Sequence, residues 1–225
     1  MPKMTKTLLL LLCTYFQLLV FSDESKPSDS YYVKDFSYIK GMPGFSDKLL
    51  DIHFTLYAGY VKNCNLLQEM LQNLANEDKA SSYEYSALKR RFSWEFDGMR
   101  LHEYYFENLG GDGKIDPNSG IYKALLGRFG SYEKWKKEFV SLGMSRGVGW
   151  VVLYIEEAGG LLHNIWVNEH NVGNLVGCKI LFAMDVWEHA YMIEYELDRS
   201  KYIGAVFQNT DWKIVEKRYE KYAKK

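Results

Sequence analysis

Apolar side chains recur at helical spacing in two long stretches of the first half of the chain. After a glycine-containing turn at 41–44, a run that begins near Ser46 places apolar and aromatic residues three or four positions apart, as in an amphipathic helix. The polar stretch 73–82 predicts a loop. A second helix is expected from about Ser86 to Leu109, where the glycine-rich segment 110–113 is a strong stop signal. Two long helices joined by a loop predict an antiparallel helical hairpin.

The second half of the chain mixes helix and strand patterns. Residues 118–145 have the pattern of two short helices. Runs rich in β-branched and aromatic residues at 149–155 and 161–168 flank a Gly-Gly turn and predict a β-hairpin, and the apolar run 179–185 predicts a third strand. A closing helical region extends from Trp187 to Tyr222. The chain is therefore expected to be α+β: an N-terminal antiparallel helical hairpin, then a C-terminal domain with a small three-stranded antiparallel sheet and helices.

The N-terminus differs from the rest of the chain. Lys3 and Lys6 precede the short apolar run Leu8–Val20, and a polar stretch follows, which is the layout of a secretory signal peptide with cleavage after Ser22. This predicts export to the periplasm or the exterior. An uncleaved signal that anchors the protein is the alternative, although the run is short for a membrane span. Three segments are expected: a signal peptide at 1–22, a helical hairpin domain at 23–112 and an α+β domain at 113–225.

Composition excludes several other classes of protein. The 225 residues are 47% hydrophobic and 16% aromatic, so disorder over most of the length is not expected. The formal net charge is -1, and no basic patch or tail is visible. We therefore expect no nucleic-acid partner and no stable membrane partner.

The chain has only five histidines, and three of them form a set with one aspartate. Asp185 ends a predicted buried strand and His189 follows four residues later, so both could reach one ion. Alone, this spacing is more typical of an aspartate helix cap with a nearby surface histidine. His53 and His102 lie among aromatic residues on the predicted inner faces of the two long helices, where many histidines are ordinary core residues. Mixed imidazole and carboxylate ligands suit iron or manganese better than a structural zinc site.

With these residues in place, the chain resembles the iron/manganese superoxide dismutase family, from about residue 40 to the C-terminus. The most specific shared motif is Asp-x-Trp-Glu-His-Ala-Tyr, intact at 185–191. The other matching positions, in chain order, are His53 with Tyr60-Val61, His102 with Phe106, Gly147-Val148-Gly149-Trp150, and Arg199, Tyr202, Asn209 and Trp212.

The resemblance implies an enzyme that converts superoxide to dioxygen and hydrogen peroxide through redox cycling of a single metal ion. It implies one iron or manganese ion per subunit, with iron slightly favoured. The implied metal ligands are His53, His102, Asp185 and His189.

Two further residues receive roles from the resemblance. The family supplies a glutamine or histidine partner for the metal-bound solvent from one of two places. Gly98, four residues before His102, cannot serve, so the partner is expected to be His170, fifteen residues before Asp185; its plain alternative is an ordinary loop histidine. The gateway tyrosine is expected to be Tyr60, with Tyr57 as its competitor.

The resemblance also implies a homodimer, in which Glu188 bonds His189 of the partner subunit. The chain departs from the family at the gateway histidine, where Leu56 and Tyr57 occupy the candidate positions, and at Met192, where a tyrosine often stands. The cross-subunit histidine–tyrosine pair of the family is therefore expected to be missing.

Two other functions compete with this interpretation. A non-haem iron oxygenase would use two histidines and one carboxylate, but its chemistry needs several open coordination positions, and four protein ligands leave fewer. An exported metal-binding relative without dismutase activity is the other alternative. Loss of a ligand would favour it, and every ligand position is filled.

Overall fold

The structure of the chain is a computed structural model, and it describes residues 30–223. The predicted signal peptide lies outside the described residues. The predicted boundary between residues 112 and 113 remains a prediction. Within residues 30–223, no helix combines the length and the apolar character that crossing a bilayer requires.

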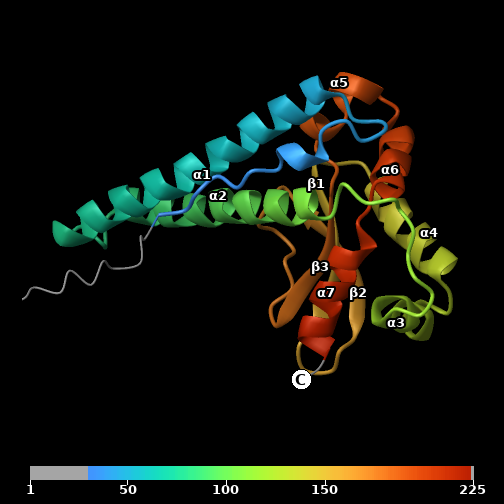
Figure 1. Cartoon of the computed structure of the whole chain (residues 1–225). Coiled ribbons are helices and arrows are strands. Elements are labelled where there is room, and N and C mark those ends of the chain that lie inside the picture. The colour runs from blue at the N-terminus through green and yellow to red at the C-terminus, as the bar shows by residue number, and fades with distance from the viewer. Residues whose placement is uncertain (1–29, 224–225) are drawn as a thin grey trace, which may run out of the picture.

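Two long antiparallel helices form an arm that extends away from the sheet (Figure 1). They are α1 (Asp47–Asn76) and α2 (Tyr83–Glu107). Ser82 begins α2 because its hydroxyl accepts a hydrogen bond from the Tyr85 amide. The loop predicted at 73–82 is thus shorter than expected, since the apolar face of α1 continues through the buried Leu74. The leader before α1 contains one short 3-10 helix, η1 (Ser37–Ile39).

A three-stranded antiparallel sheet forms the centre of the second half. Its strands are β1 (Gly149–Glu156), β2 (Leu162–Asn168) and β3 (Cys178–Asp185), in the order β2-β1-β3. The central strand β1 is buried along nearly its whole length, as its unbroken apolar run predicts. The predicted α+β fold is confirmed.

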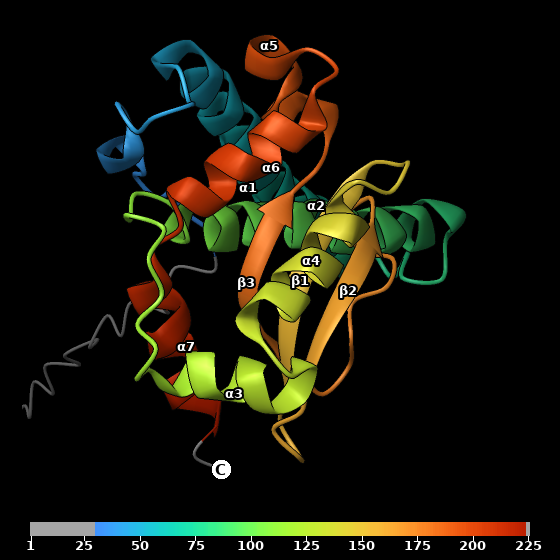
Figure 2. The ribbon, with the colours of Figure 1, turned by 90° about the vertical axis from the view of Figure 1, so that its right-hand side faces the viewer.

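Helices cover both sides of this sheet. In Figure 2, α4 (Tyr132–Gly143) lies across the face of β1 and β2, and α3 (Gly120–Phe129) lies below α4. Helix α2 crosses behind the sheet. The chain closes with α6 (Arg199–Gln208) and α7 (Trp212–Ala223), preceded by η2 (Glu188–Ala190) and the single turn α5 (Met192–Tyr195). One hydrophobic core joins the base of the arm to the sheet, and it includes Tyr57, Phe106, Trp135, Trp150 and Phe182.

Candidate metal centre

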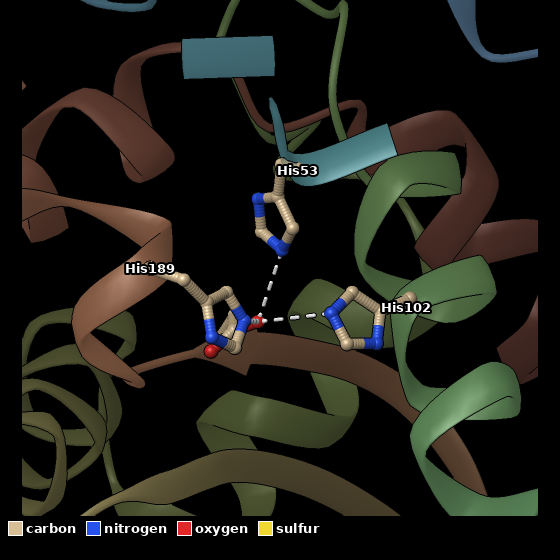
Figure 3. A group of neighbouring side chains, drawn as sticks. His53, His102 and His189 are labelled. Carbon is tan, nitrogen blue, oxygen red and sulfur yellow. Dashed lines mark hydrogen bonds and ion pairs between the residues drawn. The ribbon is translucent and has the colours of Figure 1, made fainter. Parts of the chain in front are cut away.

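Four side chains from four different elements meet where the arm joins the sheet. They are His53 of α1, His102 of α2, Asp185 at the end of β3 and His189 of η2, and their candidate ligand atoms all lie within 4.8 Å of one another. Figure 3 shows the three imidazole rings directed at one carboxylate oxygen. This oxygen is Oδ2 of Asp185, and the Nε2 atoms of His53, His189 and His102 lie 3.2, 3.1 and 3.6 Å from it.

Local contacts orient two of these side chains. The Trp187 amide donates to Oδ1 of Asp185 at 2.8 Å, which directs Oδ2 toward the histidines. The Nδ1 atom of His102 lies 2.6 Å from the carbonyl oxygen of Gly98. A carbonyl can only accept, so Nδ1 carries the proton and Nε2 keeps its lone pair. A carbonyl that fixes the tautomer of a ligand imidazole in this way is a common support in metal sites.

The protonation states of Asp185, His53 and His102 are those that a cation needs. Burial alone would raise the pKa of Asp185, but His189 and His53 hold it well below its usual range. Burial lowers the pKa of His53 and of His102, and His53 lowers that of His102 further. At neutral pH, Asp185 is therefore ionised and the buried rings of His53 and His102 are neutral.

The orphaned nitrogen of His102 shows that these residues fit a metal ion. His102 is fully buried, and its Nε2 atom has no hydrogen-bond partner among residues 30–223. A buried polar atom without a partner costs free energy, so it calls for an explanation. A cation among the four side chains would accept this lone pair. Three imidazole nitrogens and one carboxylate oxygen suit iron or manganese.

A second pair of expected residues lies beside the centre. The hydroxyl of Tyr60 is 2.8 Å from Nε2 of His170, and both residues are buried. The indole N–H of Trp150 donates to Nδ1 of His170 at 3.0 Å. Because Trp150 can only donate, Nδ1 accepts and the proton of neutral His170 is on Nε2. Burial lowers the pKa of His170 to about 4, so the ring is neutral at neutral pH.

Gly98 makes room for this pair. A Cβ atom at Gly98 would lie 2.9 Å from Cδ1 of Tyr60 and 3.3 Å from Cδ2 of His170. The position that the sequence leaves without a side chain is thus filled by Tyr60 and His170. The two rings also contact each other directly, edge to face, with their centroids 5.0 Å apart.

Tyr57 belongs to a different network. Its hydroxyl donates to Oε1 of Glu103 at 3.1 Å and accepts from the Lys34 amide at 3.2 Å. Of the two tyrosines considered from the sequence, Tyr60 is the one whose hydroxyl contacts His170. His163, the fifth histidine of the chain, received no role from the sequence and is half-buried on β2.

Sequence reasoning missed several residues around His170. It placed Trp150 in a shared motif without a role, and it gave no role to Trp94, Asp97 or Asn174. The ring of Trp94 packs edge to face on His170 at 4.5 Å between centroids. Asp97 and Asn174 hydrogen-bond to each other. Their spacing of 77 residues leaves no local signal in the sequence.

Known proteins resemble this chain over most of its length. Residues 117–218 match the family described as iron/manganese superoxide dismutases, C-terminal domain. A protein of Aquifex pyrophilus named superoxide dismutase (Fe) is 34% identical over 196 residues, which cover 85% of this chain and 92% of that protein. A protein of Haloferax volcanii named superoxide dismutase (Mn) 2 is 32% identical over 180 residues, covering 79% of this chain and 88% of that protein.

Proposed function

The chain belongs to the iron/manganese superoxide dismutase family, and we propose that it converts superoxide to dioxygen and hydrogen peroxide at one iron or manganese ion. The observation that carries the proposal is the buried convergence of three imidazole Nε2 atoms on Oδ2 of Asp185. His53, His102, Asp185 and His189 would hold the ion. When bound, iron or manganese supplies one-electron redox chemistry between its 2+ and 3+ states.

Tyr60 and His170, beside the centre, would donate and hold protons. The formation of hydrogen peroxide from superoxide consumes protons. Because Nε2–H of His170 donates to the oxygen of Tyr60, the Tyr60 hydroxyl keeps its own proton free to donate elsewhere. Burial raises the pKa of Tyr60, so the phenol stays protonated at neutral pH. We assign the gateway role to Tyr60. We assign to His170 the role of orienting the Tyr60 hydroxyl and of keeping a polar group beside the metal.

Of the two metals we favour iron. The Aquifex pyrophilus and Aquifex aeolicus proteins at 34% identity are both named as iron enzymes, whereas the Haloferax volcanii proteins at 32% are named as manganese enzymes. Both ions accept this ligand set, so the preference must come from residues around the ligands. Metal analysis of the protein purified from its native source decides between them.

The direct test of the function combines metal content with superoxide removal. The full chain would be loaded separately with iron and with manganese, and superoxide decay would be followed after rapid generation of the radical. We expect turnover with at least one ion and none in the metal-free protein. Tight metal binding without turnover for either ion would instead support the exported, metal-binding relative without dismutase activity.

We also propose a homodimer in which Glu188 bonds His189 of the partner subunit. Within residues 30–223, the Glu188 carboxylate and Nδ1 of His189 make no hydrogen bond or ion pair, so both are available to a second copy. The neighbouring side chains Met192, Ile193 and Leu197 are apolar and exposed. Light scattering should give a dimer or a tetramer built from dimers. An active monomer at working concentration would contradict this arrangement.

Export is the remaining part of the proposal. Its support is the sequence pattern alone, with Lys3 and Lys6 before Leu8–Val20. N-terminal sequencing of the mature protein should place the first residue near Asp23. A soluble cytoplasmic protein that begins at Met1 would refute export, and a membrane-bound one that begins at Met1 would show an uncleaved anchor.

A further inference from the structure

The loop 169–177, which joins β2 to β3, holds a fully buried histidine on an otherwise open segment. His170 is 0% exposed, whereas Val172 is 58% exposed and Val176 is fully exposed. Leu175 packs partly buried against the core, and the His170 ring packs against Trp94 and Trp187. Polar contacts connect the backbone of the loop to α2 and β1.

Asn174 provides the most complete set of these contacts. Its Nδ2 atom donates to Oδ2 of Asp97 at 3.0 Å and to the carbonyl oxygen of His170 at 3.1 Å. Its Oδ1 atom accepts from the hydroxyl of Tyr154 at 2.7 Å. Since Asp97 and the His170 carbonyl can only accept, the orientation of the Asn174 amide is determined.

The partners of Asn174 lie on the two elements that surround His170. Asp97 is on α2, directly before Gly98, whose carbonyl receives the Nδ1–H of His102. Tyr154 is on β1, four residues after Trp150, and is 3% exposed. Asn174 thus joins the backbone of His170 to the helix that carries His102 and to the strand that carries Trp150.

We propose that Asp97 and Asn174 are positioning residues, which hold the backbone of His170 where its ring can bridge Trp150 and Tyr60. Loss of the pair would let the loop move and would loosen both ring contacts without removing a metal ligand. The kinetic consequence rests on the proposed dismutase function, but the placement of His170 does not.

Two other contacts attach the same loop to α2 and provide a control. Asn171 Nδ2 donates to Oγ of Ser93 at 3.0 Å, and Trp94 Nε1 donates to Oε2 of Glu169 at 2.8 Å. Neither reaches the His170 backbone, and the Asn171–Ser93 contact is exposed to solvent. Asn171→Ala therefore removes a loop-to-helix hydrogen bond with the same side-chain amide donor, three residues from Asn174.

The experiment compares Asn174→Ala, Asp97→Ala, Asp97→Asn and the control Asn171→Ala in the full chain loaded with iron. Asp97→Asn keeps an acceptor oxygen for Asn174 and tests the bond apart from the charge. Each variant would be measured for bound metal, for the reduction potential of the iron, for dismutation rate and, by crystallography, for the position of the His170 ring.

We expect Asn174→Ala and Asp97→Ala to keep bound iron but to displace the His170 ring and shift the reduction potential of the iron. Turnover should slow roughly tenfold or more, which is the usual range when a residue that supports a metal site from outside the ligand set is lost. The double alanine variant should be no worse than Asn174→Ala alone, because Asn174→Ala already removes the hydrogen bond to Asp97. Asp97→Asn and Asn171→Ala should stay near the unmodified protein.

Two results would overturn the positioning role. One is an unmoved His170 ring and an unchanged potential in Asn174→Ala. The other is an equal change in Asn171→Ala, which would make the loop a general structural unit. If the unmodified, iron-loaded chain has no turnover, the proposed dismutase function fails. The ring position and the reduction potential would still decide whether Asp97 and Asn174 hold His170.

Discussion

The indole N–H of Trp150 donates to Nδ1 of His170 at 3.0 Å, and this contact determines which nitrogen of His170 carries its proton. The proton is on Nε2, which donates to the Tyr60 hydroxyl 2.8 Å away. Because the indole of Trp150 can only donate, it sets the direction of the hydrogen bond from His170 to Tyr60, beside the candidate metal centre. His170 itself is a neutral bridge between two aromatic side chains.

Replacing His170 should change the redox behaviour of the centre more than its metal content. His170→Gln keeps a polar group but cannot span from Trp150 to Tyr60 with an imidazole's geometry. We expect retained metal, a shifted reduction potential and an altered pH profile of turnover. His170→Ala should lose more activity than metal. An emptied site in His170→Ala would mean that His170 is itself a ligand.

Replacing Asp185 should empty the centre. Asp185 is the only carboxylate among the four converging side chains, and its Oδ2 is the atom the histidines share. Asp185→Ala is expected to lose bound metal and turnover together, measured by elemental analysis and superoxide decay. Asp185→Asn preserves the shape without the charge and should bind metal more weakly. Asp51→Ala, at an exposed aspartate of α1, is the matched control and should keep both metal and turnover. If Asp185→Ala kept full metal and turnover, the ligand assignment would be wrong.

Gly98→Ala should damage the site despite the higher helix propensity of alanine. The added methyl group would lie 2.9 Å from Cδ1 of Tyr60, and Tyr60 is held by His170. We expect lower turnover with metal retained. Gly127→Ala in α3 is the control, because a methyl group added there would meet no atom of the described residues within 4 Å. This control should gain up to about 1 kcal/mol in free energy of unfolding. Equal stability gains and normal turnover in both variants would show that the Tyr60 contact is unimportant.

Asp97 should make the stability of the protein depend on pH. Burial raises its pKa from 3.8 to about 6, against the opposing effect of the Asn174 hydrogen bond. Between these two values the folded chain holds a proton that the unfolded chain has released. The free energy of unfolding attributable to Asp97 therefore falls as pH rises through this window.

Asp97→Asn removes this titration and keeps an acceptor for Asn174. Denaturant midpoints of both proteins, measured from pH 5 to above pH 7 in steps of about half a unit, isolate the contribution of Asp97 by difference. The difference should favour the variant increasingly up to about pH 6 to 7 and then level off. Two parallel curves would mean that the Asp97 carboxyl has an ordinary pKa.

The sequence by itself determined the order of the elements and the four candidate ligands. Helical periodicity marked α1 and α2, and a continuous apolar run ending in Asp185 marked β3, because these patterns depend on neighbours within a few residues. The boundaries of the two helices differ from the prediction. Helix α1 continues to Asn76 and α2 begins at Tyr83, because a serine cap and the burial of Leu74 outweigh the polar composition around them.

Tertiary structure alone decided which contacts the residues around the candidate ligands make. The choice between Tyr57 and Tyr60 depends on which hydroxyl meets His170, a residue 110 positions away from Tyr60 in the chain. The proton position in His170 depends on Trp150, and its placement on Asn174 and Asp97. A hydrogen bond depends on distance and direction to within tenths of an ångström, and no local pattern of residue types encodes them. The ligand types are therefore readable from the sequence, whereas the contacts that direct them follow only from the fold.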